Sequence, residues 1–415
     1  MDGISNPQLT SKRWQPLIHR IGQCHCGYPV FFRNYLCLHC GRALGYEPAQ
    51  AVVLPLEPFV PANGDCDGMG NGLWQVAGAP AGGALYRRCA NFDLAPQCNW
   101  LVPVTDDQAG GLGSYQPLCR CCRLNRTVPD AGFANNAALW HKVELAKRRL
   151  VSSLIALGLP VASRINEDPQ RGLAFDLLAD VERLPITTGH LNGIVTININ
   201  EADDAAREAI RTALQEPYRT VLGHVRHESG HYYWRRLLEN GAWHEPFRAL
   251  FGDERQDYGA ALQNHYANGP APDWADHCVS AYASAHPWED WAETWAHYLH
   301  MVDTMDTAMA SGMESGQTDL LKDPFDADAL YRLDHEPAWE DGNGAPDDAF
   351  LDFFNAWAGL TSVLNEFSLG MGLPDFYPFV LSKRSITKLH FVHRFIAAHK
   401  ADAARLVGVE AAPAA

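Results

Sequence analysis

The sequence contains no long hydrophobic run and carries comparatively little positive charge. Its longest apolar stretch, residues 150–162, includes two serines and is far shorter than the ~20 residues of a membrane-spanning helix. The first residues contain no apolar segment of the kind that forms the core of a signal peptide. Only 33 Lys and Arg oppose 49 Asp and Glu, and the net charge of −16 disfavours nucleic acid as a partner of the whole chain. We therefore expect a cytoplasmic protein without membrane contact.

What the sequence does contain is unevenly distributed along 415 residues, a length that suits two or three domains. Residues 1–130 have a net charge of +1, whereas residues 131–415 have one of −17. All but one of the 11 cysteines lie between Cys24 and Cys122. In a chain without an export signal, such cysteines are reduced thiols or metal ligands rather than disulfides. The two ends of the chain are therefore expected to have different roles.

The first cysteine cluster has the spacing of a zinc ribbon, with two cysteine pairs that flank ten residues. Its members are Cys24, Cys26, Cys37 and Cys40. Two cysteine turns across a hairpin of this length bind a structural zinc ion through four thiolates. Because the first turn is C-x-C rather than C-x-x-C, His25 or His39 remains an alternative to one thiolate.

A second set of cysteines follows with a wider first spacing, and it predicts a second structural zinc site. The set is Cys89, Cys98, Cys119 and Cys122. Cys121 is an alternative to Cys122, and reduced buried thiols are the alternative to a zinc site. Cys66 and Cys278 have no partner by spacing, so we expect free thiols there.

The ribbon segment has features that suit two kinds of partner. Residues 8–46 carry five basic residues and no acidic one, a charge that gives only a modest, salt-sensitive affinity for phosphate. Its aromatic residues are of the type that stacks on bases, but in so small a module we expect them to form the core. They are Tyr28, Phe31, Phe32 and Tyr35. We therefore favour a ribbon that is structural or docks a protein over one that binds nucleic acid.

Hydrophobic periodicity predicts a mostly helical C-terminal part with a small sheet. Helices are expected at 138–157, 204–214, 217–239, 288–301 and 353–408, the last with a break at 370–378. The β-branched run 193–200 predicts a short strand. The acidic stretch 302–352 is expected to be a surface excursion. Together with the cysteine modules, this pattern predicts the fold class α+β.

The strongest chemical signal is an H-E-x-x-H sequence, His227-Glu228-Ser229-Gly230-His231. Four residues make about one helical turn, so the two imidazoles project from one helix face and can hold a single zinc ion. Glu228 lies beside His227, within reach of a water molecule on that ion, for which it can act as general base. The predicted helix around the motif favours a metal site over a chance match in a chain with 18 histidines.

A catalytic zinc site needs a third protein ligand and an open position. The segment 286–300 contains Glu289 and Glu293, which share one helix face, and His297 one turn further on. We favour Glu293, because it is flanked by two alanines whose small side chains let another helix approach closely. Glu289 and His297 remain alternatives, His297 also as a residue that supports a ligand.

Hydrolysis at such a site also needs a hydrogen-bond donor for the negatively charged oxygen of the transition state. Five residues are available, and the sequence gives no reason to choose among them: Tyr258, His277, Tyr282, His286 and Tyr377.

The order of these motifs resembles a bacterial family of zinc-binding metallopeptidases with an N-terminal zinc ribbon. The resemblance covers nearly the whole chain and rests on CHCG with CLHCG, CNW with CRCCRLNRTVPD, AKRRL, GHVRHESGHYYW, HPWEDWAETWAHYLH and GLPDFYPFVL. It implies a zincin-like catalytic domain in which a glutamate is the third zinc ligand. By that pattern His227, His231 and Glu293 would bind zinc and Glu228 would be the base.

The sequence therefore predicts a zinc metallopeptidase that hydrolyses peptide bonds, with one catalytic and one or two structural zinc ions. Its expected domains are a zinc ribbon at 1–47, a linker with the second cysteine-rich module at 48–130, a zincin-like metallopeptidase domain at 131–408 and a frayed tail at 409–415. The expected partners are a peptide or protein substrate and, through the ribbon, another protein. The alternative is an adaptor that binds protein or nucleic acid through the ribbon and has a catalytically quiet zincin domain.

Overall fold

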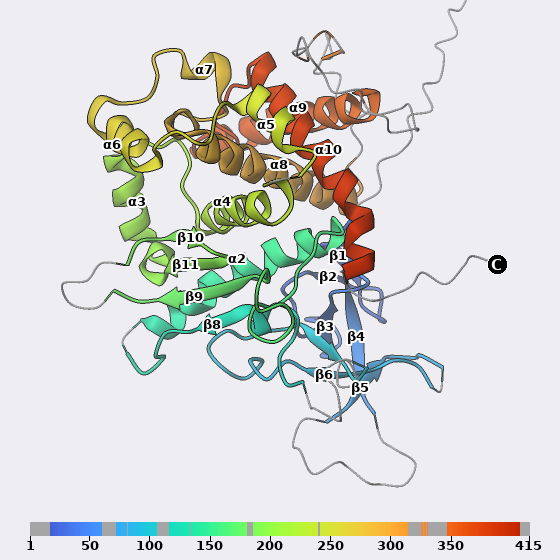
Figure 1. The fold of residues 1–415 in the computed structure, drawn as a ribbon. Helices are drawn as coiled ribbons and strands as arrows, with labels where there is room; N and C mark the ends of the chain where they lie inside the picture. Colours follow the sequence, from blue (N-terminus) through green and yellow to red (C-terminus); the bar gives the residue numbers. More distant parts are fainter. Residues whose placement is uncertain are drawn as a thin grey trace, which may run out of the picture.

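The computed structural model describes residues 17–59, 72–80, 82–105, 116–133, 135–180, 186–239, 241–313, 325, 326, 328, 330 and 347–406, with 347, 348 and 401–406 described by backbone alone. The fold is α+β, with strands toward the N-terminus and mostly helices toward the C-terminus (Figure 1). Cys66, most of the acidic stretch and the tail at 409–415 lie outside these residues. Within the described part of the chain, every helix is too short or too polar to cross a membrane.

The N-terminal part consists of a two-stranded hairpin and a five-stranded antiparallel sheet. Its strands are β1 (Ile21–Gln23), β2 (Pro29–Phe31), β3 (Ala43–Glu47), β4 (Val52–Pro58), β5 (Trp74–Val76), β6 (Leu85–Arg88) and β7 (Leu101–Pro103). β1 pairs with β2, and the other five strands follow one another in the order β3-β4-β5-β6-β7. The turn between β1 and β2 carries Cys24 and Cys26, and the segment between β2 and β3 carries Cys37 and Cys40.

A second sheet has four strands and comes from the middle of the chain. Its strands are β8 (Asn125–Thr127), β9 (Ala174–Leu178), β10 (Gly189–Leu191) and β11 (Ile194–Asn198), in the order β10-β11-β9-β8. β11 runs parallel to β9 and antiparallel to β10, so β10 is an edge strand. The strand predicted at 193–200 is confirmed as β11, which lies inside the sheet.

The predicted helices are present, and three further helices lie between residues 244 and 277, where no helix was predicted. The helices are α2 (Asn136–Ala156), α3 (Asp204–Ala213), α4 (Val221–Tyr233), α5 (His244–Phe251), α6 (Tyr258–Asn268), α7 (Trp274–His277), α8 (Pro287–Ala310), α9 (Asp347–Gly370) and α10 (Lys383–Leu406). α4 begins after Thr220, whose hydroxyl accepts a hydrogen bond from the backbone N–H of Gly223. This side-chain cap sets the start of the helix four residues later than Pro217 suggested.

The acidic stretch differs from the prediction at both of its ends. α8 continues through 302–310, where Val302, Asp303 and Asp306 are buried, and α9 begins at Asp347 with Phe350 buried. The expectation of a surface excursion is therefore wrong for these two parts. The acids on α8 are buried because they have partners in distant segments of the chain, which the local sequence does not reveal.

Helix α4 occupies the centre of the molecule. It contacts β10 and β11 of the four-stranded sheet on one side and α8 on another, and α2 packs against it as well (Figure 1). A single cluster of buried apolar residues extends from Ile18 and Cys24 in the ribbon to Phe395 in α10. The cysteine modules and the helices thus share one core, and the domain boundaries at 47, 130 and 408 stay predictions.

Candidate metal centre

Helices α4 and α8 cross closely inside the H-E-x-x-H motif. A Cβ atom placed on Gly230 would lie 2.9 Å from the Cα atom of Ala292, so only glycine fits at this crossing. The indole N–H of Trp295 donates to the hydroxyl of Ser229 at 3.0 Å, and that of Trp291 donates to the carbonyl oxygen of Gly230 at 2.8 Å. The two middle residues of the motif therefore fix α8 against α4.

Three side chains converge where the two helices meet: His227, His231 and Glu289. The Nε2 atoms of His227 and His231 lie 3.2 Å apart. Nε2 of His227 lies 3.0 Å from Oε2 of Glu289, and Nε2 of His231 lies 3.5 Å from Oε1 of Glu289. Donor atoms that share a tetrahedral zinc ion at ~2.0–2.1 Å are about 3.3 Å apart, so the three groups fit zinc. The side chains of His227 and His231 are 12% and 17% exposed, so solvent can reach the centre.

Glu293 occupies a different position from the one predicted. Its Oε1 accepts a hydrogen bond from Nδ1–H of His227 at 2.7 Å, and its Oε2 accepts one from the hydroxyl of Ser280 at 2.7 Å. Glu293 lies one turn beyond Glu289 on α8, and this turn carries its carboxylate from the Nε2 side of the imidazole to the Nδ1 side. The structure thus gives Glu289 the place that the prediction gave to Glu293. The other alternative, His297, contacts the hydroxyl of Tyr377 instead.

Glu228 adjoins this centre with a free proton acceptor. Its side chain is buried, and its Oε2 has no hydrogen-bond partner among the residues that the structure describes. Nearby, the hydroxyl of Tyr258 donates to Oε1 of Glu289 at 2.7 Å. Burial, together with the charges of Glu289 and Glu228, raises the pKa of Tyr258. Because Oε2 of Glu228 has no such donor among the described residues, it is available to accept a proton.

Two of the five predicted donor candidates lie beside the metal centre. Tyr258 contacts Glu289 directly, and the ring of Tyr282 lies 6.1 Å from that of His227. Of the other three, His286 packs on the ring of Tyr258 at 5.2 Å and caps α8 through the N–H of Trp288. His277 pairs with Asp273, and Tyr377 contacts His297.

Sequence reasoning missed His190 and Ser280, which also adjoin the centre. His190 lies on the edge strand β10, where its ring stacks on that of His231 at 6.4 Å and its Nε2 accepts the backbone N–H of Gly193 at 3.0 Å. Burial, and then the neighbouring His231, lower the pKa of His190 to about 3. Neither residue belongs to a motif, and only the fold brings His190 to His231 of α4 and Ser280 to Glu293 of α8.

The sulfur atoms of the four ribbon cysteines converge, all within 4.8 Å of one another. The sulfur atoms of Cys24 and Cys40 lie 3.7 Å apart, and those of Cys26 and Cys37 lie 3.8 Å apart. Thiolates that share a zinc ion at ~2.3 Å are about 3.8 Å apart, whereas disulfide sulfurs are ~2.05 Å apart. The four sulfurs form one candidate ligand set, to which neither histidine of the segment belongs.

The second cysteine set is buried against α2. Its members are Cys89, Cys98, Cys119 and Cys122, and the sulfurs of Cys98 and Cys119 lie 3.6 Å apart. Lys147 and Arg148 of α2 are buried beside them. Burial acts to lower the pKa of Arg148, but the nearby thiols outweigh it and raise that pKa. Lys147 also pairs with the buried Glu144 at 2.9 Å, so Arg148 is the cation that offsets the excess negative charge of four thiolates around a zinc ion. Cys121 is buried outside the set.

Comparisons with known proteins agree with this geometry. A family described as "Putative zinc-binding metallo-peptidase" matches residues 136–395, and a zinc-ribbon domain matches residues 22–132. The chain belongs to this metallopeptidase family. Uncharacterised proteins of Mycobacterium bovis and of two strains of Mycobacterium tuberculosis are 38% identical over 373 residues, which cover 90% of this chain and 93% of each relative. No solved structure matches the chain.

This member of the metallopeptidase family exposes the aromatic residues of its ribbon. Tyr28, Phe31 and Tyr35 are 44%, 49% and 51% exposed. Phe32 instead packs beneath the guanidinium group of Arg20, 4.5 Å from its ring centre. The expectation that these four rings form the ribbon core is wrong for three of them, because aliphatic side chains and two of the cysteines occupy that core.

Proposed function

We propose that this protein is a zinc-dependent peptidase whose catalytic metal is held by His227, His231 and Glu289. The observation that carries the proposal is the tetrahedral spacing of these donors beside the unpartnered carboxylate oxygen of Glu228. Three protein ligands leave the open position that catalytic zinc sites require. A bound zinc ion supplies Lewis acidity, which makes water a better nucleophile and polarises a carbonyl group.

The protein side chains then have separate tasks. Glu228 accepts the proton of the attacking water and returns it to the leaving amine. Glu293 accepts Nδ1–H of His227, which leaves Nε2 of that ring free for the metal. Ser280 fixes Glu293 in turn, and Tyr258 holds the carboxylate of Glu289.

The edge strand β10 supports a peptide as the substrate. Among the described strands, β10 pairs with β11 alone, so its other edge is open. β10 also contacts α4, and its His190 lies against His231. An extended peptide that pairs with this edge has its backbone beside the metal centre. We therefore favour a peptide over a small amide as the substrate.

The test is the substitution Glu228→Gln, assayed with a peptide library whose products are read by mass spectrometry. Loss of the general base is expected to slow cleavage about 10²- to 10⁴-fold, while the zinc content stays unchanged because Glu228 is not a ligand. Glu245→Gln, the same change at an exposed residue that pairs with Arg248, is the control and should cleave as the native chain does. Native rates in Glu228→Gln would refute the proposed role of this residue.

A second candidate function, an adaptor, is favoured by the exposed ribbon. Besides its three exposed rings, the ribbon has Leu38 at 84% exposure. Large apolar side chains that gather on a surface mark protein interaction sites. An adaptor would retain a bound partner in Glu228→Gln, and both the native chain and the variant would leave the peptide library uncut.

A further inference from the structure

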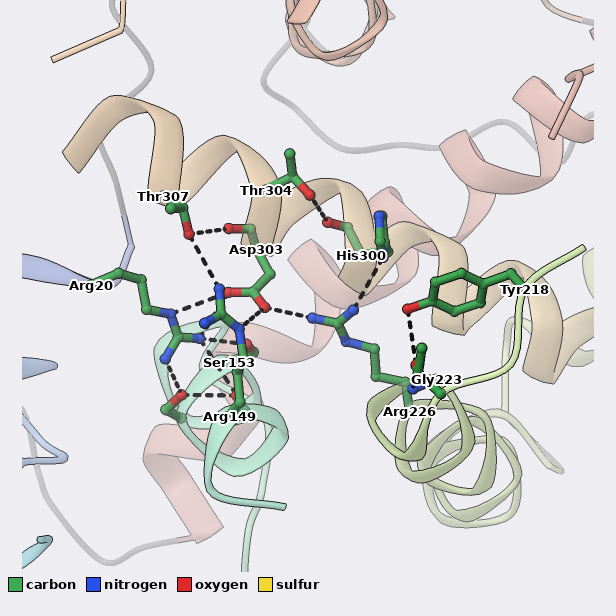
Figure 2. Close-up of polar contacts among 12 residues, drawn as sticks. Arg20, Arg149, Ser153, Tyr218, Gly223, Arg226, His300, Asp303, Thr304 and Thr307 are labelled. Carbon is green, nitrogen blue, oxygen red and sulfur yellow. Dashed lines mark hydrogen bonds and ion pairs between the residues drawn. The ribbon is translucent and has the colours of Figure 1, made fainter. Parts of the chain in front are cut away.

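A single buried carboxylate holds three arginines from three different parts of the fold (Figure 2). Asp303 belongs to α8, whereas Arg20 precedes β1 of the ribbon, Arg149 belongs to α2 and Arg226 to α4. Oδ1 of Asp303 accepts from Nε of Arg20 at 3.1 Å, and Oδ2 accepts from Nη2 of Arg226 at 2.6 Å and from Arg149. The side chains of Asp303, Arg20 and Arg226 are 4%, 2% and 3% exposed.

Arg226 connects this cluster with the metal centre, because it directly precedes His227. Its guanidinium group also donates to Nδ1 of His300 at 3.4 Å, so two residues of α8 hold it (Figure 2). A second attachment of α4 to α8 is the close crossing at Gly230. Two attachments on either side of His227 define how α4 is rotated relative to α8, and hence where the imidazole lies relative to Glu289.

Arg20 brings the ribbon into the same arrangement. Its Nη1 and Nη2 donate to the hydroxyls of Ser152 and Ser153 of α2 at 2.7 and 3.1 Å, while its Nε bonds to Asp303. Oδ1 of Asp306, one turn along α8, accepts the backbone N–H of Leu17 at 2.9 Å. The segment that leads into the ribbon is therefore attached to α8 at two successive turns.

The electrostatic balance of the cluster depends on all three cations. Burial acts to raise the pKa of Asp303, but the guanidinium groups of Arg20, Arg149 and Arg226 outweigh it and hold that pKa below its usual value. Oδ1 of Asp303 receives its hydrogen bonds from Arg20. Without Arg20, a buried carboxylate oxygen would lose its donor, and Asp303 and Arg226 would have to rearrange.

We propose that Arg20 and Asp303 are positioning residues of the metal centre, so that the zinc ribbon is a working part of the peptidase. The proposal rests on the proposed function, because it concerns the same centre. Arg20 orients Asp303, Asp303 orients Arg226, and Arg226 sets the rotation of the helix that presents His227. The ribbon thus contributes to zinc affinity at a centre to which it supplies no ligand.

The test is Arg20→Met, with zinc affinity measured by competition against a chromogenic chelator. We expect the zinc ion of α4 and α8 to bind about 10- to 100-fold more weakly, the usual loss when support behind a ligand is removed, while both cysteine sites keep their zinc. His231→Ala identifies which zinc ion is affected. The control is Arg42→Met, which removes a ribbon arginine that pairs with Glu57 and should leave the affinity unchanged.

Arg20→Lys provides a milder variant for the case that Arg20→Met does not fold. Lysine keeps the charge but cannot bridge Asp303 and both serines, so we expect an intermediate zinc affinity and faster amide exchange in residues 221–233. Zinc affinity within twofold of native in the folded Arg20→Met chain, or native affinity and exchange in Arg20→Lys, would overturn the proposal while the proposed function stands. If His231→Ala retained every zinc ion, the proposed function would fail, and this proposal with it.

Discussion

Replacing Glu289 with glutamine is expected to remove one zinc ion from the protein, whereas Glu293→Gln is expected to keep that ion with reduced affinity. Glu289 lies 3.0 and 3.5 Å from the two Nε2 atoms, so its charge and its oxygens belong to the ligand set. Glu293 contacts Nδ1 of His227 and acts on the metal through that ring. Removal of such a supporting contact typically costs 10- to 100-fold in metal affinity, and removal of an anionic ligand should cost more.

The two variants are a matched pair, because they make the same chemical change one turn apart on the same helix. The zinc content of each variant is measured after dialysis against a weak chelator. The chelator concentration that releases half of the zinc is then compared between the two variants. If Glu293→Gln lost its zinc and Glu289→Gln retained it, the assignment would be reversed and the predicted ligand Glu293 would be restored.

The second large effect is expected from Cys98→Ser. Cys98 lies fully buried in the second cysteine set, within the core that the ribbon shares with the helices. Binding of a structural zinc ion contributes on the order of 10 kcal/mol to the folded state, as much as the whole net stability of a typical domain. Loss of this site also removes the thiolates beside the buried Arg148, whereas Lys147 keeps its ion pair with Glu144. We expect a melting temperature lower by on the order of 10 °C or more, or no cooperative unfolding at all.

Cys121→Ser is the control for this prediction. Cys121 is as buried as Cys98 and lies next to the set in sequence, yet it is not one of the four converging sulfurs. Its substitution should cost about 1–3 kcal/mol, the penalty for a buried hydroxyl, without loss of zinc. Thermal melts with parallel zinc determinations test both variants. Equal destabilisation by the two substitutions would show that the second set holds no zinc.

Local patterns in the sequence predicted the two cysteine sets and most of the helices, because these depend on residues close together in the chain. The same patterns did not predict α5, α6 and α7. The H-E-x-x-H spacing requires one helical turn, and α4 provides it. The end of α8 could not be predicted in this way. Asp303 and Asp306 have the character of surface acids, and their burial depends on Arg20 and on the backbone of Leu17, which are almost 300 residues away.

For a related reason, the sequence alone could not decide whether Glu289 or Glu293 is the third ligand. Both lie on the same face of α8, one turn apart, so the position of α8 along its own axis relative to α4 decides which one meets the two imidazoles. That position is fixed by the close crossing at Gly230 of α4 and by the hydrogen bonds that Trp291 and Trp295 of α8 donate to α4. Helical periodicity locates a face, but the side chain that reaches a given atom depends on tertiary contacts.

The central claim, that α4 and α8 hold a zinc ion of their own, is tested most directly by the zinc content of the native chain beside His231→Ala. Native mass spectrometry counts the ions on each folded chain. The three candidate ligand sets among the described residues predict three zinc ions in the native protein. His231→Ala is expected to hold two, because the cysteine sites are closed and independent of it. An equal count in the two proteins would contradict the claim.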